Sequence, residues 1–562
     1  MPEPSKGTDP SVCRRAFLSR AGTTVLGFGA ARLANPVRIG ATGHELPTGG
    51  RTSSAFLDSP FRLELVELTL AEMASGISSG RWTSRMLVEG YLDRIEAFDR
   101  RGPAINSILE LNPDALALAD ALDDELRRDG PRSVLHGVPV LVKDNIGTGD
   151  RMHTSAGSLA LADFTAPEDA FVVKKLREAG CVILGKSNMS EWANARGRAS
   201  IGGWSGRGRL SRNPYVLDRS TGGSSSGTAA AVSACLVAAA VGTETMGSVV
   251  SPSSLCGIVG MRPTVGLVSR TGIIPVSFTQ DTAGPMGRTV RDVAFLLSAM
   301  VGLDPSDEAT AQVPAQVTDY TRFLDPDALR GARIGVARNL FGLSLHADRV
   351  AERSLESLRA AGAILVDPVD VPGAEAVWTF NAEVLSYELK ASLNVWFRGP
   401  GRGASVRSLA DLIAFNIRHS DQELAWFGQE TFLYAQEKGP LTSPQYQHVL
   451  SMAQRFSREE GIDAALGRHR LDALVAPTQS PAWLIDVLLG DNTVLGSFVT
   501  SAAAGYPSIS VPAGDVAGLP VGLLFMGPAW SEEKLLGYAF AFEQRTRARR
   551  PPAYLPTIQA RP

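Results

Sequence analysis

Hydrophobic and polar residues follow two different patterns along this chain, and the first has the periodicity of a helix. Within Glu64–Phe98 apolar residues recur every three or four positions, which is the spacing of one face of an α-helix. Thr69 and Thr83 stand where helix N-caps are expected, because a threonine side chain accepts a hydrogen bond from the first turn. A second helix, rich in alanine and leucine, is predicted from about Pro113 to Arg128.

The second pattern consists of short, continuous apolar runs, which are typical of strands buried on both faces of a sheet. The helix-like segment Ala170–Ala179 directly precedes one of these runs, so helix and strand alternate there. The runs are Gly137–Val142, Val182–Leu184, Ile334–Ala337, Leu474–Ala476, Ile509–Val511 and Val521–Leu524. This alternation predicts an α/β fold: one large domain around a central mixed β-sheet, with helices on both faces.

A long stretch from about Gly373 to Leu450 has a helical pattern and is rich in aromatic residues, among them Trp378, Trp396 and Trp426. We interpret it as a helical insert over the sheet, within one domain that spans residues 61–550. A Pro-rich tail, residues 551–562, follows this domain.

The first 60 residues have a different pattern. Arg14 and Arg15 precede Phe17, Leu18 and an apolar stretch over residues 21–34, an order typical of a secretory signal of the twin-arginine type. The stretch is shorter than the ~20 residues that a membrane-spanning helix needs. We expect a signal peptide at 1–34, a linker at 35–60 and an exported protein, periplasmic or secreted. The alternative is a cytoplasmic protein whose disordered tail carries a chance arginine pair.

Composition narrows the functional classes. The 562 residues are 44% hydrophobic and carry a formal net charge of −3, as in a soluble globular protein with a large core. This charge gives no reason to expect nucleic acid or an anionic membrane as a partner, and we expect no stable membrane insertion. The four cysteines form no CxxC pair and the seven histidines no HExxH motif. We therefore expect no disulfide framework, no metal and no cofactor.

Three segments combine residue types suited to nucleophilic catalysis. Lys143 ends the first buried run; taken alone, such a lysine is a strand end whose ammonium reaches water. The Gly/Ser run 222–227 leads directly into Thr228–Val241, an apolar stretch of small residues that predicts a buried helix. A glycine-rich turn that presents backbone N–H groups and serine hydroxyls at a helix N-terminus fits this better than a linker does. The third segment, Gly242–Ser248, predicts a loop after that helix. Taken alone, Ser248 would simply cap the next segment.

A rival interpretation takes Gly223–Gly227 as G-x-S-x-G, the nucleophile elbow of α/β hydrolases, with Ser225 as the nucleophile. That motif needs a buried strand immediately before it, and residues 213–221 are polar. A Ser225→Ala variant separates the two interpretations, because only the elbow makes this change abolish acylation.

Taken together, the three segments resemble the amidase signature family. Its pattern is a lysine in G-[IV]-P-x-x-[VL]-K-D-N, then G-G-S-S-[SG]-G, then G-T-[DE]-x-x-G-S. Ser224 and Ser248 lie 24 positions apart (248 − 224), as this family requires. The resemblance runs from about residue 65 to 545, and its further segments are Gly260–Thr264, Gln280–Pro285, Asp472–Thr478 and Gly505–Pro507.

Other segments are similar to the bacterial peptide amidases within this family, namely residues 185–194, 203–205, 408–416 and 481–483. This resemblance implies hydrolysis of the C-terminal carboxamide of peptides with release of ammonia, so the partner would be a peptide or small-molecule amide. One alternative is an amidase for other aryl or aliphatic amides or esters. Another is an exported amide-binding protein with weak catalysis. The family also contains the amidase subunit of tRNA amidotransferases, and an export signal argues against that role.

The resemblance also implies a role for each residue of the site. Ser248 would attack the amide carbon and form an acyl-enzyme. Ser224, held by a cis peptide bond, would relay the proton to Lys143, which must be neutral and therefore buried. The oxyanion hole would consist of the backbone N–H groups of Thr245, Met246, Gly247 and Ser248.

Position 246 departs from the family pattern, which usually has Gly or Asp there. Backbone donors form the hole, so Met246 leaves the chemistry intact unless the backbone at this position is left-handed, where a methionine would be strained. For the substrate pocket we expect Trp192, Ala193 and Asn194, with the helical insert as a lid. Core packing is the alternative role for these three residues.

Overall fold

The computed structural model describes residues 65–314, 317–492 and 496–559. The predicted signal peptide and the whole of the predicted linker lie outside these residues, as does Cys13, and the targeting assignment stays a prediction. All of the described residues belong to one compact unit.

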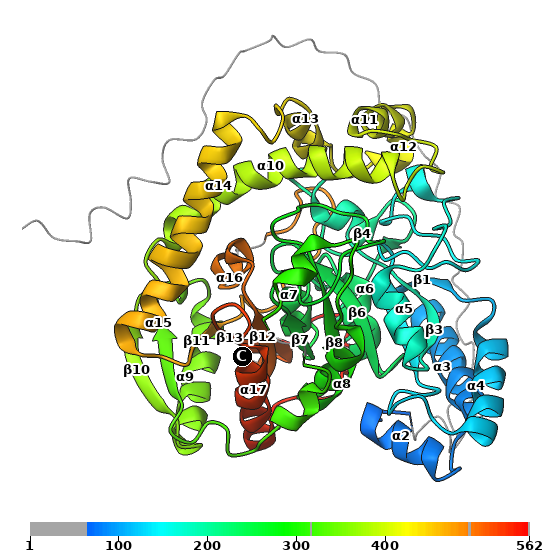
Figure 1. Cartoon of the computed structure of the whole chain (residues 1–562), viewed down its shortest axis with the longest axis horizontal. Helices are drawn as coiled ribbons and strands as arrows, with labels where there is room; N and C mark the ends of the chain where they lie inside the picture. Colours follow the sequence, from blue (N-terminus) through cyan, green and yellow to red (C-terminus); the bar gives the residue numbers. More distant parts are fainter. Residues whose placement is uncertain (1–64, 315–316, 493–495, 560–562) are drawn as a thin grey trace, which may run out of the picture. The chain divides into compact units, whose positions relative to one another are not determined.

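Within the described residues, eleven strands form one mixed sheet in the order β1-β3-β2-β6-β8-β7-β12-β13-β11-β9-β10 (Figure 1). Strand β2 is parallel to β3 and β6, and β9 is parallel to β10 and β11. From β6 to β11 every pairing is antiparallel. The bounds are β1 Ile108–Leu111, β2 Pro139–Lys143, β3 Val182–Ser187, β6 Ala239–Glu244, β7 Val259–Arg262, β8 Thr282–Gly287, β9 Arg333–Ala337, β10 Ile364–Val369, β11 Ala473–Pro477, β12 Ser508–Val516 and β13 Leu519–Met526, with the short pair β4 Trp204–Ser205 and β5 Arg209–Leu210.

The central strands are buried on both faces. In β11, Ala473 and Val475 belong to one apolar core with residues of α8, α9 and α17. Leu474 and Ala476, which alternate with them, belong to a second core with residues of α15 and α16. Because successive side chains of a strand point to opposite faces, two-sided burial requires a continuous apolar run. This is the pattern that the sequence shows, and the predicted α/β class with helices on both faces of a mixed sheet is confirmed.

Helices surround this sheet, and both predicted N-caps are present. Thr69 and Thr83 accept hydrogen bonds from the backbone N–H groups of Glu72 and Met86. The bounds are α2 Leu70–Ser78, α3 Ser84–Arg94, α4 Ala115–Asp129, α5 Phe171–Glu178, α6 Ser226–Ser233, α7 Val250–Leu255, α8 Val290–Met300, α9 Leu345–Ala360, α10 Ala374–Arg398, α11 Leu409–Arg418, α12 Ser420–Glu423, α13 Glu430–Gln436, α14 Pro444–Ser457, α15 Asp463–His469, α16 Val499–Ala504 and α17 Glu532–Thr546.

The prediction of one helix over Thr228–Val241 is wrong. Helix α6 ends at Ser233, the chain turns at Cys235 with a left-handed φ of 56°, and the last residues of the stretch begin β6 at Ala239. The Arg288 guanidinium donates to the carbonyls of Val232 and Val237 on either side of this turn. A continuous run of small apolar residues suits a buried helix and a buried strand equally, so periodicity alone does not separate them.

Helices α10 to α13 and the first half of α14 fall in the stretch predicted as a helical insert, and Figure 1 shows α10, α11 and α13 together at the upper edge of the view. The Pro-rich tail also has a defined place, since backbone hydrogen bonds join Tyr554 and Leu555 to residues 214–217. In the part of the chain that the structure describes, no helix has both the length and the apolar character to cross a membrane.

Candidate active site

Lys143 is the last residue of β2, and its side chain is wholly buried. Its Nζ lies 2.8 Å from Ser224 Oγ and 3.1 Å from Ser225 Oγ. It also lies 3.0 Å from Thr243 Oγ1 and 3.1 Å from the Thr243 carbonyl oxygen. Thr243 belongs to β6, which is parallel to β2, so the carboxyl ends of both strands reach the same edge of the sheet. The fold therefore places Lys143 within hydrogen-bonding distance of Ser224, as the sequence predicts.

Burial lowers the pKa of Lys143 to about 7, because the charged ammonium loses its hydration. The negative charges of Asp281 and Glu244 oppose this shift without cancelling it. At neutral pH about half of the Lys143 side chains are then neutral amines that accept a proton.

The Gly/Ser turn holds two serines in different ways. The Gly223–Ser224 peptide bond is cis, as the resemblance implied. Ser225 Oγ donates to the Thr243 carbonyl (3.1 Å), and the Ser225 N–H donates to the carbonyl of Ser248. Ser225 is thus a buried connection between the two serine segments. No strand precedes it over residues 213–221, so the arrangement of a nucleophile elbow is not formed.

Ser248 lies in the turn between β6 and α7, where a buried carboxylate orders the backbone. Glu244 Oε2 accepts hydrogen bonds from the N–H groups of Val249 (2.7 Å) and Val250 (3.1 Å). Among the described residues, no group is hydrogen-bonded to the Ser248 hydroxyl, and Ser248 lines a cavity of about 540 Å³.

The two residues before Ser248 differ in their backbone. Gly247 has a φ of 81°, and a Cβ added there would come within 2.2 Å of Phe498 Cε2, so only glycine fits. Met246 is not among the residues with a positive φ. The methionine therefore occupies this position without left-handed strain.

Two charged residues that the sequence analysis gave no role hold the same turn in place. Arg262 Nη1 donates to the carbonyls of Glu244 (3.2 Å) and Thr245 (3.1 Å). Asp281 accepts from Thr245 Oγ1 at 2.6 Å. Arg262 and Asp281 fall in segments that carry the family resemblance, and this was the only signal that the sequence offered for them.

The three residues predicted for the pocket separate into two groups. Ala193 and Asn194 line the 540 Å³ cavity, and helices α10 and α13 of the insert also contribute to its wall. Trp192 is buried in the core instead, where its ring centroid lies 6.4 Å from that of Phe397 and 6.1 Å from that of Phe432. Trp192 thus has the core position of the alternative interpretation, and substrate binding by Ala193 and Asn194 stays a prediction.

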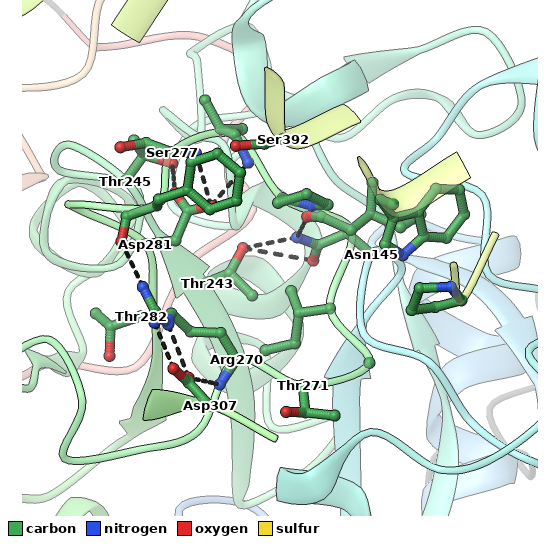
Figure 2. A pocket seen from close by; sticks show the side chains of 18 of the residues that line it. Asn145, Thr243, Thr245, Arg270, Thr271, Ser277, Asp281, Thr282, Asp307 and Ser392 are labelled. Carbon is green, nitrogen blue, oxygen red and sulfur yellow. Dashed lines mark hydrogen bonds and ion pairs between the residues drawn. The ribbon is translucent and has the colours of Figure 1, made fainter. Parts of the chain in front are cut away.

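A second cavity, of about 370 Å³, shares Ala193, Thr245 and Val276 with the first in its lining (Figure 2). Its wall includes Asn145 and Thr243, and Asn145 Nδ2 donates to Thr243 Oγ1 at 3.0 Å. Figure 2 also shows Arg270 beside Asp307, with which it forms an ion pair. In the described part of the chain, no group of three or more His, Cys, Asp or Glu side chains is arranged to hold a metal ion.

The fold and this site define an amide hydrolase: a buried lysine lies against a serine-rich turn, beside a cavity that holds a further serine. The family model described as Amidase matches residues 86–536, and the chain belongs to this family.

Individual relatives support the same assignment. A probable amidase of Arabidopsis thaliana is 40% identical over 90% of this chain and 95% of its own length. The structure of a peptide amidase from Stenotrophomonas maltophilia is 50% identical, with a TM-score of 0.83 over 88% of this chain and all of that one. A peptide amidase in complex with the competitive inhibitor chymostatin is 51% identical, with a TM-score of 0.84, and the match covers 86% of this chain and 99% of that one.

Proposed function

We propose that this amidase removes the C-terminal carboxamide of peptides, with Ser248, Ser224 and Lys143 as its catalytic residues. The observation that carries the proposal is the 2.8 Å contact between the buried Lys143 Nζ and Ser224 Oγ, beside the cavity that Ser248 lines. A substrate amide bound there would have a nucleophile, a proton relay and backbone N–H donors around one carbon atom.

Acylation begins with the neutral form of Lys143. This amine takes the proton of the Ser224 hydroxyl, and Ser224 takes that of Ser248, while Ser248 Oγ attacks the amide carbon. The backbone N–H groups of residues 245–248 stabilise the negative charge on the carbonyl oxygen, and one such donor is typically worth about 3 kcal/mol.

Collapse of the tetrahedral intermediate completes the first half of the reaction. The proton returns from Lys143 through Ser224 to the amide nitrogen, the C–N bond breaks and ammonia leaves. An ester between the peptide carbonyl and Ser248 remains. Water then attacks this ester with the same relay, which releases the peptide acid and restores the Ser248 hydroxyl.

The choice of a peptide substrate rests on the two peptide amidase structures at 50% and 51% identity. The cavity agrees with it, because its volume of about 540 Å³ lies within the ~300–1,000 Å³ range of sites for molecules of drug size. Such a cavity is large enough for the last residues of a peptide.

The test is ammonia release from a short peptide with a C-terminal amide, measured for the wild-type protein and the Ser248→Ala variant. A free amino-acid amide and a simple aryl amide serve as comparators. We expect release from the peptide amide that is lost in the variant. Cleavage of the comparators alone would contradict the peptide assignment and favour an amidase of different scope.

Reaction with a fluorophosphonate probe separates catalysis from mere binding. We expect the probe to label Ser248, and the Ser248→Ala variant to stay unlabelled. A folded wild-type protein that neither reacts with the probe nor releases ammonia would contradict the proposed function and favour the amide-binding alternative.

A further inference from the structure

Asn381 of α10 is wholly buried and contacts the turn that carries Ser248. Its Nδ2 donates to Met246 Sδ at 3.5 Å and to Gln280 Oε1 at 3.2 Å. Its Oδ1 accepts from Gln280 Nε2 at 2.6 Å. The Asn381 and Gln280 amides therefore form a reciprocal pair, and this pair contacts the residue at which the chain departs from the family pattern.

The pair is part of a closed set of contacts around residues 244–246. The Gln280 carbonyl accepts from Arg262 Nη2 at 2.6 Å. The Nη1 atom of the same guanidinium donates to the Glu244 and Thr245 carbonyls. The turn is thus held on its backbone by Arg262 and at the Met246 side chain by Asn381, with Gln280 connecting the two.

Helix α10 has a second buried anchor on the same segment. Glu388 lies seven residues after Asn381, about two helical turns, and so on the same face of α10. Its carboxylate accepts hydrogen bonds from Ser277 Oγ, from the Thr279 N–H (3.2 Å) and from Tyr446 Oη of α14 (2.6 Å). Two polar contacts therefore fix α10 to the segment 277–280. Arg262 and Asn381 connect this segment to the turn around Thr245 and Met246.

We propose that Asn381 is a positioning residue for the oxyanion hole, which it holds in place through Gln280 and Met246. The inference rests on the proposed function, because it concerns the N–H groups of residues 245–248. The N–H donors must be in place before the negative charge forms on the oxyanion. A small displacement of these donors therefore reduces the stabilisation of the transition state far more than it reduces substrate binding. The thioether of Met246 supplies an acceptor for Asn381 that a glycine at this position lacks.

The experiment compares Asn381→Leu with the wild type on a peptide amide. We expect kcat to fall about 10- to 100-fold while KM changes less than about threefold, because the contact acts on donor placement and not on the substrate. The affinity ratio of a peptide aldehyde to the matching alcohol should fall by a similar factor, since only the aldehyde forms an oxyanion with Ser248. The midpoint of the pH profile should stay where it is.

The matched control is Asn416→Leu. Asn416 of α11 is also wholly buried and donates to a glutamine, Gln429 Oε1, at 3.0 Å, away from the Ser248 turn. We expect it to lower stability as Asn381→Leu does while kcat is kept. Equal kcat losses in the two variants would overturn the inference, as would an unchanged kcat in Asn381→Leu.

The amide swap keeps the test valid if Asn381→Leu does not fold. The double variant Asn381→Gln with Gln280→Asn can rebuild the reciprocal pair and should recover kcat relative to Asn381→Gln alone; a double variant no better than the single one would contradict the inference. Failure of the proposed function is seen separately, since the wild type itself would then release no ammonia. Loss of activity in Ser248→Ala but not in Asn381→Leu would overturn the positioning role alone.

Discussion

At the scale of single residues, the proposed role of Lys143 as a base links catalysis to stability. Its pKa falls from 10.5 to about 7 on folding, so the unfolded chain binds more protons than the folded chain between these values. Below pH 7 the free energy of unfolding is lowered by the whole cost of burying a charged lysine, and this cost disappears as the pH rises toward 10.5.

Replacing Lys143 with methionine tests this linkage. We expect the variant to lack amidase activity and the wild type to gain stability relative to it by up to about 4 kcal/mol as the pH rises from 7 to 10.5. Denaturant unfolding of both proteins at several pH values measures the difference. A stability difference that does not change with pH would mean that Lys143 keeps an ordinary pKa.

Gly247 gives a second prediction at this scale. Its φ of 81° and the nearby Phe498 ring exclude a side chain. We expect Gly247→Ala to cost about 1–3 kcal/mol of stability and to lower kcat, because the adjacent Ser248 must shift. Thermal unfolding and ammonia release measure the two effects. Gly331→Ala is the control, since Gly331 also has a positive φ (76°) but an added Cβ would meet nothing within 4 Å.

The sequence indicated Lys143, Ser224 and Ser248 because each stands in a motif with fixed spacing. It gave no role to Arg262 or Asp281, whose contacts with the Ser248 turn join segments distant in the chain. Trp192 shows the opposite limit. Its neighbours Ala193 and Asn194 line the cavity, and only the packing of α10 and α13 against its indole reveals that it belongs to the core.

At the scale of elements, a buried ion cluster joins α12 to the loop that follows β3. The Arg196 guanidinium contacts Glu191 at 2.7 Å and Glu423 of α12 at 3.2 Å, and all three side chains are buried. Burial, reinforced by the charge of Glu423, raises the pKa of Glu191 well above its usual value. The single arginine thus compensates two carboxyl groups next to Ala193 and Asn194.

We therefore expect Arg196→Met to destabilise the protein by about 3–5 kcal/mol, because it leaves both carboxyl groups buried without a cation. Arg198→Met, at an exposed position two residues further on, should change stability by less than about 0.5 kcal/mol. Denaturant unfolding compares the two variants. Equal stabilities would show that the cluster does not hold α12 in place.

Element prediction succeeded where burial and periodicity agree. The apolar runs of β2, β9 and β11 are strands because both of their faces are covered. The prediction of one helix after Ser224 failed because alanine and valine fill both α6 and β6. The turn between these elements is made by Cys235 and by the distant Arg288. No local feature of the sequence marks that turn.

At the scale of the whole molecule, the order of elements along the chain predicted the α/β class but not the order of strands in the sheet. Strand β6 lies between β2 and β8, although α7 and β7 separate β6 from β8 in the chain. Such pairings depend on contacts between distant segments.

The N-terminal arginine pair makes a prediction about where the protein works. We propose that the Arg14–Arg15 pair directs export through the twin-arginine route, and we expect Arg14→Lys with Arg15→Lys to leave the precursor in the cytoplasm. Arg20→Lys is the control and should be exported normally. Cell fractionation with an amidase assay measures the distribution, and export of the double variant at the wild-type level would contradict the proposal.

The pH dependence of kcat/KM on an N-acetylated peptide amide, measured from pH 5 to 10, tests most directly whether neutral Lys143 activates Ser248 through Ser224. The lysine acts as a base only when neutral, so the rate should rise about tenfold per pH unit below 7 and level off just above it. A rate that still rises tenfold per unit beyond pH 9 would contradict the lowered pKa of Lys143. A rate that does not rise at all between pH 5 and 10 would show that the proposed relay from Ser248 to Lys143 is wrong.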